Sequence, residues 1–207
     1  MKNPNFRIGM TSVEALVEII RANLNRSSGL WGEFVSFYTY VPKGNTRDRK
    51  VNTLSQLLFH DPSEPTDVIR GRGITVDSLN EKIGLLQKDS VLAILSAMRI
   101  SPSYTYHIVP MMDFHCPTGL ESLSRIEQFL KVIRQKEGVI LDSGRSYHYY
   151  GVNLMDGKEW LDFLGDCLLS GLVDVRHVGH RLKDRCGILR ISACPLRPKI
   201  PTVVSIL

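Results

Sequence analysis

The residues best suited to chemistry lie in the stretch 142–151, Asp-Ser-Gly-Arg-Ser-Tyr-His-Tyr-Tyr-Gly, which follows an apolar run. In a strand, residues two apart share a face, so Ser146 and His148 would point one way and Arg145 the other. A hydroxyl and an imidazole beside a glycine turn with free backbone N–H groups suit an anionic oxygen such as a phosphate. The alternative interpretation is the polar face of an ordinary exposed strand.

Two further polar pairs occupy apolar segments. Asp113 and His115 alternate with apolar residues, so their side chains would share a face. Burying a carboxylate alone is costly, so we expect Asp113 to have a partner. In the stretch 172–176, which we predict as a strand, Asp174 and Arg176 alternate with valines in the same way.

If these strands are neighbours and their polar faces coincide, carboxylates, imidazoles, a hydroxyl and a guanidinium converge. Such a set can hold a hard divalent cation, because Mg²⁺ prefers oxygen ligands and Mn²⁺ also accepts imidazole. The cation would bridge nucleotide phosphates, which Ser146 and His148 would hold from the other side. We therefore predict Mn²⁺ or Mg²⁺ as the cofactor, with Asp113, His115 and Asp174 as its ligands and as the catalytic residues.

The order of these pairs resembles the signature of the archaeo-eukaryotic primase superfamily, which includes the primase-polymerases. That signature is Asp-x-acid, then Ser-x-His, then a hydrophobic residue and Asp. Here Asp113-Phe-His115, Ser146-Tyr-His148 and Val173-Asp174 occupy its places. The likeness covers roughly residues 105–192. It implies an α/β (α+β) fold in which an RRM-like catalytic sheet packs with an N-terminal α/β subdomain, with the active site between them.

By the same resemblance, Asp113 and Asp174 would hold the metal, and the Ser-x-His pair would bind the triphosphate of an incoming nucleotide on a nucleic-acid template. The implied chemistry is attack of a 3′-hydroxyl on the α-phosphate, with metal ions lowering the pKa of the hydroxyl and neutralising the pyrophosphate. The predicted nucleotide-binding residues are Arg145, Ser146, His148, Arg176, Arg181 and Arg190.

His115 departs from the superfamily pattern, which has a second carboxylate at this place. A neutral imidazole removes one negative charge and weakens Mg²⁺ binding in particular. Three functions therefore stay open: a primase-polymerase nucleotidyltransferase; a catalytically degenerate module that binds nucleotides or nucleic acid within a larger assembly; or a metal-dependent phosphodiesterase using Asp113, His115 and His148. A helicase or an accessory subunit is a further candidate partner.

Two basic segments are candidates for contact with a nucleic-acid backbone, and solvated surface is the alternative. They contribute Lys43, Arg47, Arg49 and Lys50 from a polar loop, and Arg70 and Arg72 from an Arg-Gly-Arg-Gly turn. A zinc site would have to use His177, His180, Cys186 and Cys194. Their spacing fits no standard finger, so a structural zinc is not expected.

The composition is that of a globular protein, because 43% of the 207 residues are hydrophobic and 23% are charged. The net charge of +5 permits a nucleotide or nucleic-acid partner. No apolar run reaches transmembrane length, no signal peptide is evident, and the four cysteines form no CxxC pair. We predict a cytoplasmic protein without a membrane partner. Walker, HExxH and GxSxG patterns are absent, so ATPase, zincin and serine-hydrolase functions have no support.

The elements that must position these residues follow from hydrophobic periodicity and capping patterns. A capping box opens a helix at Thr11–Glu14, a second stands at Thr118–Glu121, Asp156 caps a third helix, and Gly138 is the expected C-cap of the second. Helices are predicted at 11–24, 53–60, 77–87, 118–137 and 156–171, strands at 32–41, 105–116, 139–151, 172–176 and 187–192, and a helix or a hairpin strand at 90–100. We predict one compact unit with an N-terminal subdomain (1–104) and a catalytic subdomain (105–207).

Overall fold

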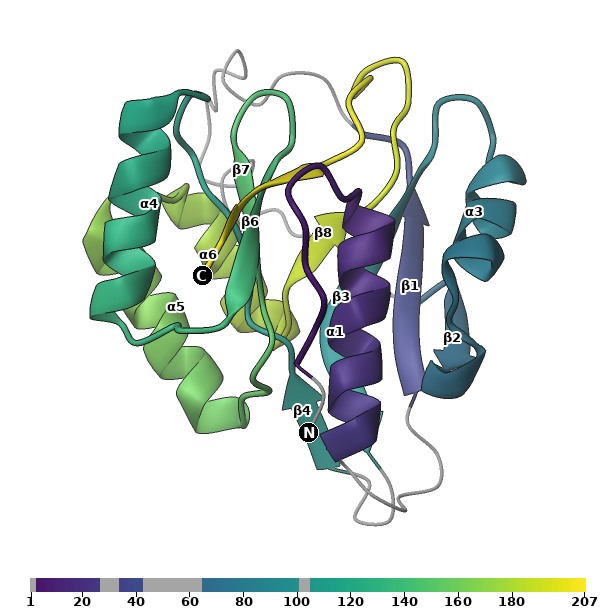
Figure 1. Cartoon of the computed structure of the whole chain (residues 1–207), viewed down its shortest axis with the longest axis horizontal. Coiled ribbons are helices and arrows are strands. Elements are labelled where there is room, and N and C mark those ends of the chain that lie inside the picture. Colours follow the sequence, from purple (N-terminus) through teal and green to yellow (C-terminus); the bar gives the residue numbers. More distant parts are fainter. Residues whose placement is uncertain (1–2, 27–33, 43–64, 101–104) are drawn as a thin grey trace.

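Two antiparallel sheets form the framework of the computed structural model, which describes residues 3–26, 34–42, 65–100 and 105–207 (Figure 1). The first sheet has the order β2 (Asp67–Arg70), β1 (Phe34–Tyr40), β3 (Val91–Ile100) and β4 (Thr105–Ile108), and β8 (Ile188–Arg190) also pairs with β3. The second sheet has the order β5 (Met111–Asp113), β7 (Tyr147–Gly151), β6 (Gly138–Asp142) and β9 (Thr202–Ile206).

The segment 90–100, which the sequence left open, is a strand. β3 pairs with β1 on one side and with β4 and β8 on the other, and its residues from Val91 to Leu95 are all buried. A strand buried on both faces carries a continuous apolar run, so the period of two disappears from its sequence. The expected hairpin with the next segment is confirmed, because Ala97 pairs with Ile108.

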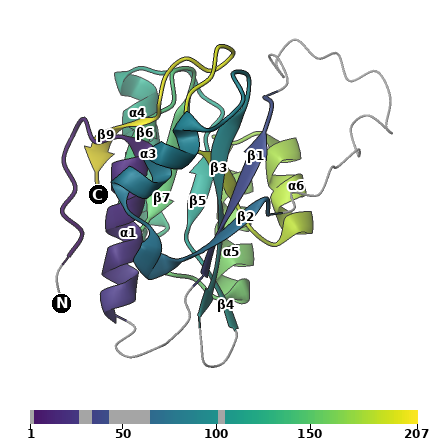
Figure 2. The same cartoon turned by 90° about the vertical axis from the view of Figure 1, so that its right-hand side faces the viewer.

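Helices cover both sheets. Helix α1 (Ser12–Arg26), the 3-10 turn η2 (Gly71–Gly73) and α3 (Val76–Gly84) lie on one side of the first sheet, and α4 (Leu120–Val132), α5 (Gly157–Ser170) and α6 (Val175–Asp184) lie toward the other end of the molecule (Figures 1 and 2). Val139 and Leu141 enter the core that contains α1, whereas Ile140 enters the core formed with α4 and α5. The second sheet is therefore buried on both faces.

Capping residues set the helix ends, with two exceptions to the sequence predictions. The capping box of α1 is present, because Thr11 N–H donates to Glu14 Oε2 at 2.7 Å and Glu14 N–H donates back to Thr11 Oγ1 at 3.3 Å. Asp156 and Glu159 cap α5 in the same way. The predicted box at Thr118–Glu121 is wrong: Gly119 is the N-cap of α4, with no side-chain cap.

Gly138 is likewise not the C-cap of α4. The helix closes earlier, where Arg134 adopts a left-handed conformation (φ 61°) and Gln135 N–H donates to Leu130 O at 2.8 Å. Gly138 instead opens β6 in a place where a Cβ would lie 2.6 Å from Tyr150 O. A close approach of two backbones, rather than a helix end, therefore requires this glycine.

The predicted strand at 172–176 is also wrong. Val173 makes a single bridge to Phe114, and the chain then enters α6 with Asp174 as its N-cap. The Asp174 side chain accepts hydrogen bonds from the N–H groups of Arg176 and His177. This cap satisfies donors that would otherwise lack partners at the helix start, and it overrides the β preference of the valines. Asp174 and Arg176 consequently do not share a strand face.

The second sheet has an RRM-like arrangement. The chain runs β5, α4, β6, β7 and α5 and returns at Val173, so Val173, β5, β7 and β6 lie side by side in that order. This is the order of a β-α-β-β-α-β unit in which a single bridge at Val173 stands in place of the last strand, as expected for the RRM-like sheet. The mixed α/β fold class is thereby confirmed. Sheet membership crosses residue 105, because β4 and β8 belong to the first sheet, and the division into subdomains stays a prediction.

Candidate functional site

Asp113, Ser146 and His148 are brought together by the pairing of β5 with β7. Asp113 is the register partner of His148, and antiparallel partners point to the same face. The Asp113 Oδ1 atom lies 3.7 Å from His148 Nε2 and accepts a hydrogen bond from Ser146 Oγ at 3.3 Å. The hydroxyl and imidazole of the Ser-x-His pair therefore both face the carboxylate.

The turn before Ser146 is held by its own hydrogen bonds. Ser143 N–H and Ser143 Oγ both donate to Ser146 O at 3.0 Å. Gly144 has φ 101°, a conformation that favours glycine, and its N–H donates to Asp142 Oδ1 at 2.7 Å. The sequence-based expectation of free N–H groups in this turn is thus wrong for Gly144.

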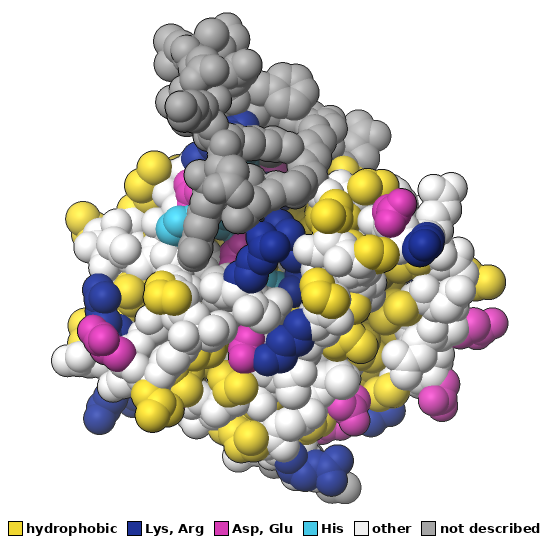
Figure 3. Space-filling model, turned by 90° about the horizontal axis from the view of Figure 1, so that it is seen from above, with side chains coloured by type: hydrophobic (Ala, Val, Ile, Leu, Met, Phe, Trp, Pro, Cys, Tyr) yellow, Lys and Arg dark blue, Asp and Glu magenta, His cyan; other side chains and the backbone are white. Residues whose placement is uncertain are grey.

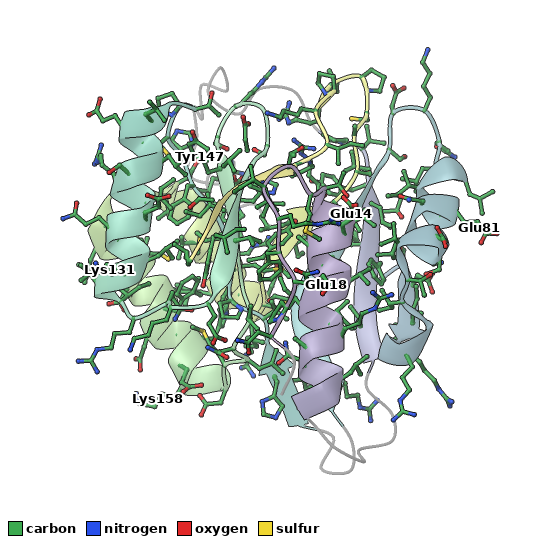
Figure 4. The ribbon with its side chains drawn as sticks, viewed as in Figure 1. Glu14, Glu18, Glu81, Lys131, Tyr147 and Lys158 are labelled. Atoms are coloured by element: carbon green, nitrogen blue, oxygen red, sulfur yellow. The ribbon has the colours of Figure 1, made fainter. Side chains whose placement is uncertain are left out.

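Tyr147 anchors the same strand from the opposite face. Its hydroxyl donates to Gly119 O at 3.1 Å and accepts from Gly119 N–H at 2.8 Å, which ties β7 to the start of α4 (Figure 4). This attachment holds the strand that carries His148 against α4, whose Ile126 and Leu130 are buried in the core.

The segment that leads to Asp174 lies along the side of β5 that faces away from β7. Phe114 and Val173 form an antiparallel bridge, and His115 N–H donates to Leu172 O at 2.7 Å. Asp174 directly follows this bridge, on the side of β5 away from β7, and there the chain leaves the sheet and starts α6. Both capping bonds of Asp174 use Oδ1. The two motif aspartates are thus near one another along the backbone, but the Asp174 carboxylate caps the start of α6.

Burial controls the charge states in the site. The Asp113 side chain is 42% exposed, yet the surrounding protein desolvates its carboxyl group. This desolvation raises the pKa of Asp113 to about 6. The hydrogen bond from Ser146 and nearby positive charges lower the same pKa and so offset part of the increase. Burial lowers the pKa of His148 well below its usual value, and that of His177 to about 3. Both imidazoles are therefore neutral at pH 7, and the contact of His148 with Asp113 is no ion pair.

Two predicted phosphate-binding arginines are largely buried. Arg190 is only 7% exposed, and its guanidinium donates to the carbonyl oxygens of Ser143, Ser192 and Lys199. Arg181 Nη2 lies 3.1 Å from Asp184 Oδ2. In the part of the chain that the structure describes, the Arg181 Nε and Nη1 atoms have no hydrogen-bond partner.

The remaining arginines of the predicted nucleotide site lie on elements around this centre. Arg145 is exposed on the turn between β6 and β7, and Arg176 Nε lies 3.3 Å from His180 Nε2 on α6. His115 is exposed just beyond β5, and its charge is one of those that lower the pKa of Asp113.

Only one of the two predicted basic segments lies within the residues that the structure describes. Arg70 pairs with Phe34 at the start of β1, whereas the site lies toward the opposite end of that strand, and Arg72 follows in η2. The structure thus separates these two arginines from Asp113. The predictions for Lys43, Arg47, Arg49 and Lys50 concern residues outside the described ranges. On the face seen in Figure 3, Lys and Arg side chains gather beside Asp or Glu and His side chains.

No preformed metal cage is seen. Among residues 3–26, 34–42, 65–100 and 105–207, no three His, Cys, Asp or Glu side chains are grouped so that they could hold an ion. This statement covers the predicted set of Asp113, His115 and Asp174. It also covers the zinc alternative of His177, His180, Cys186 and Cys194. All four cysteines are buried and free.

Sequence reasoning missed Tyr40 at the end of β1. Burial raises the pKa of its hydroxyl, which also responds to the charges of Arg190, Asp113, Arg197 and Arg181. The first sheet therefore contributes an aromatic side chain to the site. The only signal in the sequence is the alternation of tyrosines in the predicted strand 32–41, which says nothing about Asp113.

A family model described as archaeo-eukaryotic primase 1D-like (AEP-like) matches residues 71–202, which is more than half of the chain. The chain belongs to this AEP-like family. The match spans β5, β6 and β7 of the second sheet, α6 and β8, and so includes all three signature pairs of this AEP-like chain. Comparison with curated proteins and with solved structures gives no significant match. Among the described residues of the AEP-like chain, no helix is long and apolar enough to cross a membrane.

Proposed function

We propose that this chain is a primase-polymerase-like nucleotidyltransferase that adds nucleotides to a nucleic-acid 3′-hydroxyl. One observation carries the proposal: Asp113 accepts a hydrogen bond from Ser146 and lies 3.7 Å from His148, and the Phe114–Val173 bridge brings the chain that leads to Asp174 along the other side of β5. This is the arrangement needed to present carboxylates and phosphate-binding groups to one triphosphate. The membership in the AEP-like family supports the same function.

The donor set fits a hard divalent cation that a nucleotide brings with it. Mg²⁺ commonly binds proteins through one or two carboxylates, with water and substrate phosphates as its other ligands, so a cage of three protein ligands is not required. Asp113 and Asp174 would supply the two carboxylates. The raised pKa of Asp113 fits this role, because a desolvated carboxylate is the group that a cation would stabilise most.

The carboxylates, Ser146 and His148 would then have separate roles in the reaction. A divalent cation at the carboxylates would lower the pKa of the 3′-hydroxyl and neutralise charge on the phosphates. Ser146 Oγ, which donates to Asp113, can turn its hydroxyl toward a phosphate oxygen. His148, being neutral, would offer an N–H hydrogen bond rather than a positive charge. Protonation of Asp113 below about pH 6 would reduce cation binding.

Primer extension with Mn²⁺ or Mg²⁺ and labelled nucleoside triphosphates tests this proposal. Asp113→Asn and Asp174→Asn should each lower incorporation by about 100-fold or more, because each removes a charge at the reacting phosphates. Asp162→Asn is the matched control: Asp162 is exposed on α5 and pairs with Lys158, so incorporation should not change. Incorporation that survives both Asp113→Asn and Asp174→Asn would overturn the assignment.

A second candidate is a catalytically degenerate module that binds nucleotides without turnover. It is favoured by the exposed His115 in place of a carboxylate and by the use of Asp174 as a helix cap. In that case the wild-type chain incorporates nothing, yet it binds nucleoside triphosphates with an affinity that falls in His148→Ala and survives Asp113→Asn. Equilibrium binding measured beside primer extension separates the two functions. Cleavage of an oligonucleotide without any triphosphate would instead indicate the phosphodiesterase.

A further inference from the structure

Two stacked tyrosines, Tyr38 and Tyr40, stand on β1 beside the candidate site. Their ring centroids are 5.5 Å apart and their planes differ by 18°. Residues two apart on a strand share a face, so Tyr38 and Tyr40 lie on the same face of β1. Phe37 lies on the opposite face and is fully buried in the core that contains α1. The tyrosine pair therefore occupies the face of the first sheet away from that core.

The register of the first sheet aligns the pair with residues of the site. Tyr38 pairs with Ala93, which in turn pairs with Arg190, so these residues form one row across β1, β3 and β8. Strand β2 pairs with β1 only from Phe34 to Phe37. The end of β1 that carries the tyrosines thus extends beyond the register of β2, and both rings are partly exposed.

Charges around Tyr40 complement a nucleic acid. The Tyr40 hydroxyl lies within electrostatic range of Arg181, Arg190 and Arg197 as well as of Asp113. Aromatic rings next to cationic groups are the usual means of binding single strands, because bases stack on the rings while phosphates face the cations. Of these arginines, Arg197 is partly exposed, whereas Arg181 and Arg190 are largely buried and contribute positive potential rather than phosphate contacts.

We propose that Tyr38 and Tyr40 form a base-stacking surface that holds a single-stranded nucleic acid against the Asp113 site. The inference rests on the proposed nucleotidyltransferase function and names its polymeric partner. Two rings in succession along β1 suit consecutive bases of a strand better than one free nucleotide. Stacking uses the π-face that every base has, so the binding is expected to be tolerant of sequence.

Fluorescence anisotropy with a labelled oligodeoxythymidylate, without metal or triphosphate, tests the proposal. Tyr40→Leu should weaken binding by about 5-fold to about 100-fold, whereas Tyr40→Phe, which keeps the ring, should stay within about 2-fold of wild type. Tyr106→Leu is the matched control, because Tyr106 is 63% exposed on β4, away from the site. An abasic oligonucleotide with the same backbone should bind wild type and Tyr40→Leu equally.

The outcomes separate this inference from the function on which it rests. Asp113→Asn should abolish incorporation and leave oligonucleotide binding at least as tight, so either idea can fail alone. Equal loss for the abasic strand, or no loss in Tyr40→Leu, would overturn the stacking surface. If Tyr40→Leu weakens the binding of a free nucleoside triphosphate and not that of the oligonucleotide, the proposal is also overturned, because the rings would then contact the incoming nucleotide. If Tyr40→Leu does not fold, Tyr40→Trp supplies the readout: its fluorescence should be quenched by the oligonucleotide and not by the abasic strand, and absence of quenching refutes the proposal.

Discussion

Replacement of Arg190 by lysine tests whether this buried arginine builds the site or touches the substrate. Its guanidinium donates to the carbonyls of Ser143, Ser192 and Lys199, and so ties the turn before Ser146 to the segment that leads into β9. A single ammonium cannot reproduce this fork of donors. We therefore expect Arg190→Lys to loosen both segments.

The size of the effect follows from the carbonyls that lose their partner. If lysine keeps only the bond to the part-buried Lys199 carbonyl, the buried carbonyls of Ser143 and Ser192 are left unpaired, at about 1–1.5 kcal/mol each, or about 2–3 kcal/mol in all. In a chain of this size each kcal/mol lowers the melting temperature by about 2–4 °C, so a decrease of about 4–12 °C is expected. Urea unfolding and thermal melting measure both quantities.

Arg197→Lys is the matched control for this experiment. The Arg197 guanidinium donates to the carbonyl of its neighbour Leu196, an exposed contact, so its loss should change stability by about 0.5 kcal/mol or less. If Arg190→Lys is as stable as wild type but its KM for the nucleoside triphosphate rises strongly, the structural reasoning is refuted. Arg190 would then contact phosphate, as the family resemblance predicts.

Further predictions concern Asp113, one crowded glycine and one helix cap. Because burial raises the pKa of Asp113 to about 6, the folded chain keeps a proton that the unfolded chain loses near pH 4, so this group's contribution to stability falls as the pH rises through that window. Asp113→Asn should remove that fall and be at least as stable as wild type at pH 7 in urea unfolding; a less stable variant would contradict the sign. Gly138→Ala should cost about 1–3 kcal/mol by overpacking, since its Cβ would meet Tyr150 O at 2.6 Å. Gly157→Ala, with nothing within 4 Å of its Cβ, should melt no lower than wild type, and equal melting of the two variants would argue against crowding. Asp156→Ala should cost about 1 kcal/mol in chemical denaturation through loss of the α5 cap, and no cost would show that the cap is dispensable.

Local patterns in the chain were enough to predict much of the fold. The capping box at Thr11 and the cap at Asp156 predict the starts of α1 and α5 because they depend only on residues within one turn. The Ser-x-His pair could be recognised because the period of two in a strand sets the face of each side chain whatever the strand packs against. Motif order likewise identified the family, since it is a property of the chain alone.

Where the patterns failed, a competing local interaction or a distant segment decided the outcome. Two valines favoured a strand at Asp174, but the side chain's bonds to two backbone N–H groups start α6 there instead. Gly138 looked like a helix cap, whereas its real constraint is contact with β7, which lies across the sheet. The cap at Asp174 is local but competes with the β preference of the valines, whereas the contact of Gly138 with β7 is not visible in a window of a few residues.

The sequence by itself determined the pairs Asp113/His115 and Ser146/His148 and the family to which they belong, because spacing along a strand and motif order need no partner. Only the tertiary structure decided that β5 lies against β7, that Arg190 is buried among carbonyls, and that Tyr40 of the first sheet stands near a carboxylate of the second. The physical reason is that burial and long-range strand pairing set charge states and neighbours, and both depend on which distant segments exclude water from one another.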